Sequence, residues 1–110
     1  MTFKKRLLAQ AEAELREIFW WIKERSPDGA ARWLAAFESA TESTLRNPIS
    51  QPIAPEDALV DYEVRHFVFK TRRGHRYRAV YAVVDDEVRI LHIRGPGQDV
   101  MSELGPPDDA

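Results

Sequence analysis

The chain has 110 residues, of which 44% are hydrophobic and 31% charged, and its formal net charge is −2. This length and balance are typical of one folded domain, and no apolar run approaches the about 20 residues that a membrane helix needs. The absence of cysteine excludes disulfides, thiolate metal sites and a cysteine nucleophile. Charged residues soon follow the basic N-terminus, so we expect no secretory signal and a cytoplasmic protein.

The first half of the chain predicts two helices, after a stretch over 3–8 that is compatible with a short strand. Apolar side chains recur at helical spacing from 9 to about 25, at Ala11, Leu15, Ile18 and Ile22. Ser26 predicts the start of a second helix, because serine caps helices and Pro27 suits the first helical position. Pro48 ends this helix, since proline disfavours helix in the residue before it. The short connection predicts an antiparallel helical hairpin.

The second half predicts an antiparallel sheet. Residues 48–61 contain three prolines and no period, and we expect a surface loop there. Alternating apolar residues then predict strands at 62–70, 76–84 and 87–94, joined by short turns. The chain is therefore expected to form a single α+β domain over residues 1–97, with the N-terminal helical hairpin packed on a small twisted, mainly antiparallel sheet. Residues 98–110 are expected to form a flexible, acidic, proline-containing tail, and whether it folds back on the strands is left open.

Positive charge is concentrated in the predicted sheet. Residues 65–84 contain no acidic residue and six basic ones, which are Arg65, Lys70, Arg72, Arg73, Arg76 and Arg78. Such clustering produces a local positive field whatever the total charge is. These residues are either solvated strand and turn residues or part of a site for an anion.

Three motifs occur in order along the chain. They are Leu45-Arg46-Asn47-Pro48 after the second helix, Tyr77-Arg78-Ala79-Val80-Tyr81 in the second predicted strand of the sheet, and Val88 to Arg94 in the third. In order and spacing, over about residues 3–97, the chain resembles the RelE/ParE superfamily, the toxins of type II toxin–antitoxin systems. The resemblance implies the α+β fold described above, growth arrest as the activity, and an antitoxin as partner. We expect the antitoxin to lay an acidic, amphipathic segment across the basic face or into a groove beside the helices.

The resemblance also implies candidate site residues. Members that cleave mRNA on the ribosome need cations that neutralise the phosphate and a group that transfers a proton. Arg78 matches the arginine that these members use on the scissile phosphate, and Arg65 and Arg94 match basic positions on the neighbouring strands. We expect Arg65 and Arg78 to project into one anion-binding hollow beneath the helices. Substrate binding is the role implied for Lys70, Arg72, Arg73 and Arg76.

The proton-transfer group is less evident. Several of these nucleases place a histidine or tyrosine just after the last strand, where this chain has Gly95-Pro96-Gly97-Gln98. His92 lies two residues before Arg94, so both project from the same face of a strand, and His92 is a candidate base or a hydrogen-bonded structural residue. Tyr77 and Tyr81 are interpreted as core residues, with a base-stacking surface as the alternative. The pattern of histidines and carboxylates fits no metal site, and no cofactor is expected.

Three functions are consistent with this pattern. The basic strands favour ribosome-dependent mRNA cleavage that inhibits translation, with the ribosome and mRNA as targets. The alternative is that of ParE-like members, which do not cleave RNA but bind DNA gyrase and trap its cleaved DNA complex. An inactive, toxin-like interaction module is the third.

Overall fold

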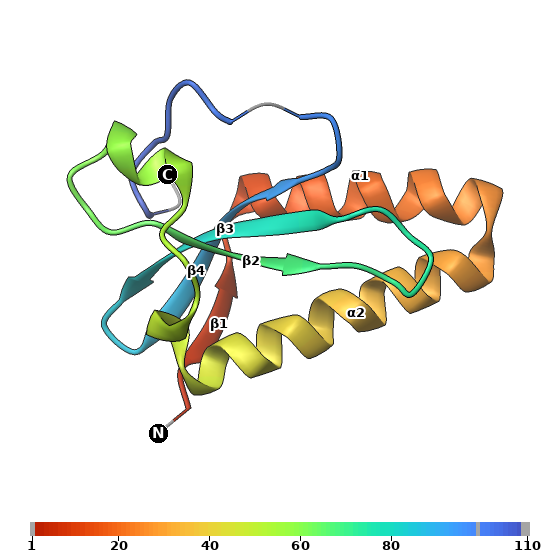
Figure 1. Ribbon diagram of the computed structural model, residues 1–110, viewed down its shortest axis with the longest axis horizontal. Helices are drawn as coiled ribbons and strands as arrows, with labels where there is room; N and C mark the ends of the chain where they lie inside the picture. The colour runs from red at the N-terminus through yellow and green to blue at the C-terminus, as the bar shows by residue number, and fades with distance from the viewer. Residues whose placement is uncertain (1, 99, 109–110) are drawn as a thin grey trace.

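A computed structural model describes residues 2–98 and 100–108 and shows two helices beside a sheet (Figure 1). The short strand predicted near the N-terminus and both helices form, and the later strands follow in the predicted order. The elements are β1 (Lys4–Leu7), α1 (Ala9–Arg25), α2 (Pro27–Arg46), the 3-10 helices η1 (Pro48–Ser50) and η2 (Pro55–Leu59), β2 (Arg65–Phe69), β3 (Tyr77–Val84) and β4 (Glu87–Arg94).

The four strands form one mixed sheet in the order β1-β4-β3-β2. β2, β3 and β4 pair antiparallel with their neighbours, whereas β1 pairs parallel with β4 at the edge. The two helices lie side by side over one face of this sheet (Figure 1). The predicted α+β class, with a helical hairpin on a mainly antiparallel sheet, is therefore confirmed.

Ser26 caps both helices of the hairpin, at the end of α1 and at the start of α2. The backbone N–H of Ser26 donates to the carbonyl of Ile22 at the end of α1. Its side-chain Oγ accepts from the N–H of Gly29, 3.0 Å away, at the start of α2. Pro27 follows at the first helical position, where no N–H donor is required. The Ser26-Pro27 signal was thus sufficient to place the junction.

An aromatic core fills the space between the helices and the sheet. The rings of Phe37 and Phe69 lie 5.2 Å apart, and Trp33 meets Tyr77 at 5.4 Å between ring centroids. Tyr81 is fully buried, and its hydroxyl donates to the carbonyl of Pro48. Burial raises the pKa of Tyr81 to about 12. The interpretation as a core residue is confirmed for Tyr81, whereas Tyr77 is partly buried and packs against the same core.

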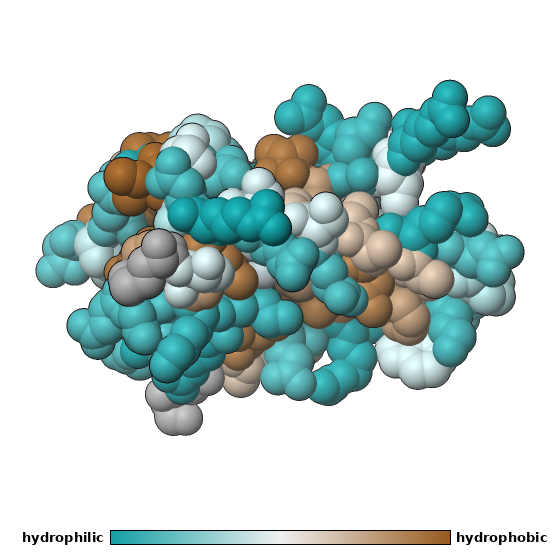
Figure 2. Space-filling model, turned by 90° about the horizontal axis from the view of Figure 1, so that it is seen from below, coloured by the Kyte–Doolittle hydropathy of each residue, from teal (hydrophilic) through white to brown (hydrophobic). Residues whose placement is uncertain are grey.

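The other face of the sheet is also covered. Val80 packs under Ala54 from the 48–61 segment, and Leu104 from the C-terminal segment packs on both apolar clusters of this face. The prediction of a plain surface loop at 48–61 is wrong, because the segment contains η1 and η2 and buries Ala54. Each short helix begins at a proline and is too short to show a period. Figure 2 shows one side of the molecule, where hydrophilic residues predominate and apolar residues appear between them.

The C-terminal segment contacts the domain through polar groups as well. The hydroxyl of Tyr62 donates to the carbonyl of Gly105, and Arg89 on β4 pairs with Asp108. The described part of the predicted tail therefore folds back against the strands. Asp109, which belongs to the same acidic tail, lies outside the described residues.

An irregularity in β4 decides which way its side chains point. Val80 pairs with His92, but the next residue, Tyr81, pairs with Ile90, so Leu91 is an extra residue in the ladder. Such a bulge shifts the alternation of side chains by one. Ile90 and Ile93 consequently both join the core under the helices, whereas Leu91 packs on the other face.

Candidate functional site

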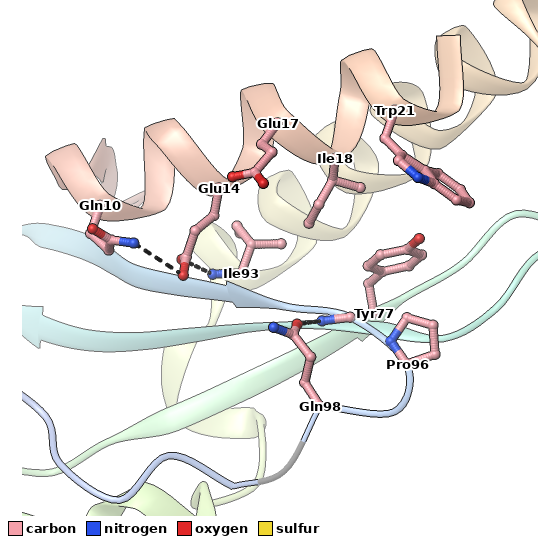
Figure 3. A pocket seen from close by; sticks show the side chains of 10 residues that line it. Gln10, Glu14, Glu17, Ile18, Trp21, Tyr77, Ile93, Pro96 and Gln98 are labelled. Atoms are coloured by element: carbon pink, nitrogen blue, oxygen red, sulfur yellow. Dashed lines mark hydrogen bonds between the residues drawn. The ribbon is translucent and has the colours of Figure 1, made fainter. Parts of the chain in front are cut away.

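A groove of about 440 Å³ lies between α1 and the end of β4 (Figure 3). Its apolar residues include Ile18 and Tyr77, and its carboxylates are those of Glu14 and Glu17. None of the described residues that line it is basic, and none is a predicted site residue. The hollow beside α1 is thus acidic, and the anion-binding hollow expected there is not formed by this groove.

The strand register separates Arg65 from Arg78. Arg65 pairs with Tyr81 of the core, whereas Arg78 pairs with Val68, three residues further along β2. Side chains alternate between the faces of a sheet, so an offset of three places the two arginines on opposite faces. The prediction that they project into one hollow is therefore wrong. The alternation within each strand does not determine how the two strands align. The sequence therefore does not predict that Arg65 and Arg78 lie on opposite faces.

Other predicted residues are brought together on the face away from the helices. Arg94 pairs with Arg78 across the β3–β4 ladder, and His92 and His66 both pair with Val80. Register partners project from the same face, so all four polar side chains share it. The predicted placement of His92 and Arg94 on one face is confirmed, and Arg78 joins them.

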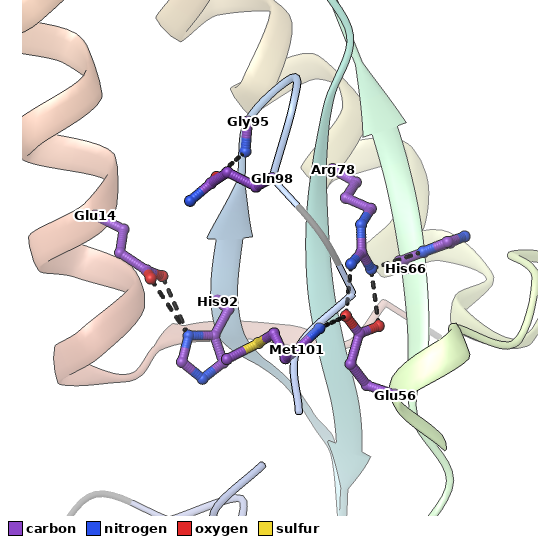
Figure 4. Close-up of polar contacts among 8 residues, drawn as sticks. All are labelled: Glu14, Glu56, His66, Arg78, His92, Gly95, Gln98 and Met101. Atoms are coloured by element: carbon purple, nitrogen blue, oxygen red, sulfur yellow. Dashed lines mark hydrogen bonds and ion pairs between the residues drawn. The ribbon is translucent and has the colours of Figure 1, made fainter. Parts of the chain in front are cut away.

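The guanidinium of Arg78 is held by a carboxylate of the same chain (Figure 4). Its Nη1 and Nη2 atoms donate to the two oxygens of Glu56, with the Nη1 contact at 2.9 Å. Nη1 also lies 3.2 Å from Nδ1 of His66. Glu56 is fully buried, and the Arg78 side chain is 17% exposed. This two-point contact occupies both Nη atoms, one of the donor pairs through which a guanidinium can bind a phosphate.

The C-terminal segment completes the pair. The backbone N–H of Met101 donates to Oε2 of Glu56 at 3.2 Å. Burial alone would raise the pKa of Glu56, but the hydrogen bonds from Arg78 and Met101 outweigh it and lower the pKa to about 2. Glu56 is therefore ionised at neutral pH and neutralises Arg78.

Arg65 is engaged on the other face of the sheet. Its Nε donates to Oε1 of Glu63 at 2.7 Å, and its Nη1 donates to the carbonyl of Gln51. The Arg65 side chain is 18% exposed, whereas Glu63 is 57% exposed. Arg65 thus links β2 to the preceding segment. It takes no part in the contacts of Arg78 on the opposite face.

His92 contacts a carboxylate on α1 (Figure 4). Its Nδ1 lies 3.3 Å from Oε1 of Glu14, which also accepts from the backbone N–H of Ile93 at 2.9 Å. Burial raises the pKa of Glu14, but the contacts with His92 and Ile93 outweigh it and lower the pKa overall. His92 is therefore placed as a hydrogen-bonded residue that links the end of β4 to α1.

The four predicted substrate-binding residues lie at the β2–β3 hairpin, and all are exposed. Within residues 2–98 and 100–108 none of them forms an ion pair, so this hairpin presents unneutralised positive charge. The residues are Lys70, Arg72, Arg73 and Arg76. In the same described part of the chain, no three His, Asp or Glu side chains gather as metal ligands, and no helix is long and apolar enough to cross a membrane.

The model of one protein family matches residues 6–100 of the chain, and that family is described as ParE toxin of type II toxin-antitoxin system, parDE. The chain belongs to this ParE toxin family. The comparison with curated proteins and the comparison with solved structures both find no match. The resemblance to the RelE/ParE superfamily is confirmed. As a type II toxin, the protein has an antitoxin as its partner. Family membership alone selects neither mRNA nor gyrase as the target of this ParE-family toxin.

Sequence reasoning missed the side chains that occupy the predicted site of the toxin. Glu56 lies in the proline-rich segment, where no periodicity indicates burial. Glu14 lies three residues after Ala11 and four before Ile18, which places it beside the buried stripe of α1. This position was the one available signal that Glu14 could reach the sheet.

Proposed function

We propose that this toxin arrests growth by binding DNA gyrase and trapping its cleaved DNA complex, without cleaving RNA. The observation that carries the proposal is the Arg78–Glu56 pair. In the mRNA-cleaving members that the chain resembles, the arginine at this position binds the scissile phosphate. In this toxin both Nη atoms of Arg78 donate to Glu56.

The energetics favour the internal pair over a phosphate. A phosphate could bind both Nη atoms of Arg78 only by displacing Glu56, which would leave a buried carboxylate without its partner. Leaving a buried charge without its partner costs about 3–5 kcal/mol, and a phosphate bound to Arg78 would have to offset this cost. The backbone N–H of Met101 adds a further contact to Glu56 that a phosphate would have to break.

The remaining groups that RNA cleavage requires are not gathered around Arg78. Arg65 lies on the opposite face of the sheet, and Nδ1 of His92 contacts Glu14. The segment after β4 supplies neither histidine nor tyrosine. These observations favour the gyrase function that the resemblance implies for ParE-like members over the nuclease function.

The basic β2–β3 hairpin supports contact with DNA in this proposal. Exposed arginines and lysines bind phosphates in a way that depends on charge and not on sequence. Arg72 and Arg73 lie in the turn of this hairpin, and Lys70 and Arg76 lie on either side of it. We propose that these cations position the toxin on the DNA backbone within the gyrase complex.

The test compares two reactions of the purified toxin. In the first, supercoiled plasmid, gyrase and ATP are incubated with the toxin, and linear DNA is measured after detergent and protease treatment. In the second, a reporter mRNA is translated in a ribosome-containing extract. We expect linear DNA to accumulate relative to a toxin-free reaction while the mRNA stays intact. Cleavage of the mRNA within codons, with no linear DNA, would contradict the proposal.

The role of the hairpin is tested in the first reaction. Arg73→Glu should reduce DNA trapping, and the difference from the wild type should shrink as the salt concentration rises, because salt weakens the phosphate contact that the variant lacks. Arg46→Glu, an exposed change at the C-terminal end of α2, beside the start of β1 and away from the hairpin, is the matched control and should leave trapping unchanged. Equal effects of the two substitutions would argue against a DNA contact at the hairpin.

A further inference from the structure

We propose that the groove between α1 and β4 receives an extended segment of the antitoxin, which adds as a strand to the edge of β4 and places a basic side chain against Glu14 and Glu17. This inference does not rest on the gyrase proposal. It requires only that the toxin has an antitoxin partner, which its family membership implies.

From Leu91 to Arg94, one edge of β4 is not paired with any strand of the described chain. β1 pairs with β4 only from Glu87 to Ile90. The N–H of Leu8 then donates to the carbonyl of Ile90, and the chain turns into α1. From Leu91 onward this side of β4 faces α1 and the groove. An edge of this kind offers backbone groups to an added strand.

In the free toxin, two side chains accept hydrogen bonds from the N–H groups that an added strand would use (Figure 3). The N–H of Ile93 donates to Oε1 of Glu14, and the N–H of Gly95 donates to Oε1 of Gln98. These N–H groups are two residues apart on one edge, which corresponds to about 7 Å along an extended strand. Alternate carbonyls of an incoming extended segment have the same spacing and could replace both side-chain oxygens. Gln98 is exposed, so its side chain has room to move aside.

The two carboxylates in the groove favour an antitoxin segment that carries a basic side chain. Glu14 and Glu17 both line it, and Glu17 forms no ion pair within residues 2–98 and 100–108. The contacts with His92 and Ile93 hold the pKa of Glu14 below its usual value, so this carboxylate stays charged at neutral pH. A basic side chain would pair with these groups, whereas an acidic one would be repelled. The expectation that an acidic antitoxin segment lies in a groove beside the helices therefore does not fit this groove.

The opposite end of the groove is aromatic. Figure 3 shows Trp21 and Tyr77 facing each other there, with Pro96 close to Tyr77. Trp21 is 56% exposed, although large aromatic residues are usually mostly buried, and the guanidinium of Arg25 lies 3.9 Å from its ring centroid. Side chains of an added strand that point into the groove are also about 7 Å apart. The segment is therefore expected to carry one basic and one apolar residue two positions apart.

The first test measures the affinity of the full-length toxin for the antitoxin encoded beside its gene, by isothermal titration. Trp21→Ala and Glu17→Lys should each weaken binding by about tenfold or more, as expected for the loss of a central aromatic anchor and for a reversed charge. The matched controls are Trp20→Ala and Glu24→Lys, which change the same residue types on α1 outside the groove lining. They should stay within about twofold of the wild type. Groove variants that bind like these controls would overturn the proposal.

The second test asks whether the segment binds as a strand. Hydrogen–deuterium exchange of the toxin is measured with and without the antitoxin, and the amides of Ile93 and Gly95, which the free toxin bonds only to side chains, should exchange more slowly on binding. A helix seated in the groove would leave these amides unprotected, and this result would overturn strand addition. Thermal unfolding of each free variant shows whether it is folded. Neither test involves gyrase, so failure here is distinguishable from failure of the gyrase proposal.

Discussion

Replacing Glu56 with glutamine should lower the free energy of unfolding by about 3 kcal/mol, the lower end of the cost of breaking a buried ion pair. Glutamine keeps the shape of the side chain but removes the charge that faces Arg78. Both residues are well shielded from water, with Glu56 fully buried and Arg78 17% exposed. Arg78 would then be a buried cation without its counter-charge. A domain of this size has about 5–15 kcal/mol of stability, so the variant should remain folded.

The pKa of Glu56 gives an independent magnitude. It is lowered from 4.5 to about 2 in the folded protein, which corresponds to about 3 kcal/mol. Because folding lowers this pKa, the carboxylate stabilises the fold fully above pH 4.5. The stabilisation is lost as the pH falls from 4.5 towards about 2. Glu56→Gln should therefore lose stability at neutral pH and vary less with pH across this window than the wild type.

The assay is urea unfolding at pH 7 and at pH 3, followed by circular dichroism. Glu63→Gln is the matched control, because Glu63 also pairs with an arginine but its side chain is 57% exposed. An exposed ion pair contributes about 0–1 kcal/mol, so this control should change little. The reasoning is refuted if Glu56→Gln is no less stable than Glu63→Gln, or if its pH dependence equals that of the wild type.

Three further predictions concern the stability of the fold, each measured by urea unfolding. Ser26→Ala should cost about 1 kcal/mol, because the Oγ that caps α2 is lost, and no change would show that the cap is dispensable. Asp85 has a φ of 56°, in the left-handed region that a β-branched residue rarely adopts. Asp85→Val should therefore cost about 1–2 kcal/mol, whereas Asp85→Gly should not. Equal effects of the two substitutions would contradict this account of the turn. Phe37→Ala should cost about 3–5 kcal/mol through the cavity it leaves among the aromatic rings, and a loss below about 1 kcal/mol would mean that the core collapses around it.

The elements that the sequence predicts well depend on local chemistry. The apolar spacing of α1, the Ser26-Pro27 junction and the stop at Pro48 are each encoded within a few residues. The strands β3 and β4 were likewise predicted within one residue of their observed ends, since alternation and the Asp85-Asp86 turn mark them. The family resemblance depends on the same local motifs and their order.

The arrangement of the candidate site depends on contacts that are distant in the sequence. The separation of Arg65 from Arg78 follows from the β2–β3 register, and the facing of His92 follows from the extra residue Leu91 in the ladder. The partner of Arg78 comes from η2, 22 residues earlier in the chain. The periodicity of the sequence does not predict these pairings. Arg65 and Arg78, which the sequence suggests for binding an anion, are therefore found paired with carboxylates of the same chain.

We propose that the toxin acts on gyrase-bound DNA and does not cleave mRNA, since Glu56 holds both Nη atoms of the arginine that cleavage would require. The most direct measurement is to induce the toxin in growing bacterial cells and to map DNA double-strand breaks and mRNA ends in the same culture. We predict that double-strand breaks accumulate at gyrase sites while the mRNA ends stay as in uninduced cells. New mRNA ends within codons, in cells whose DNA remains intact, would contradict the account.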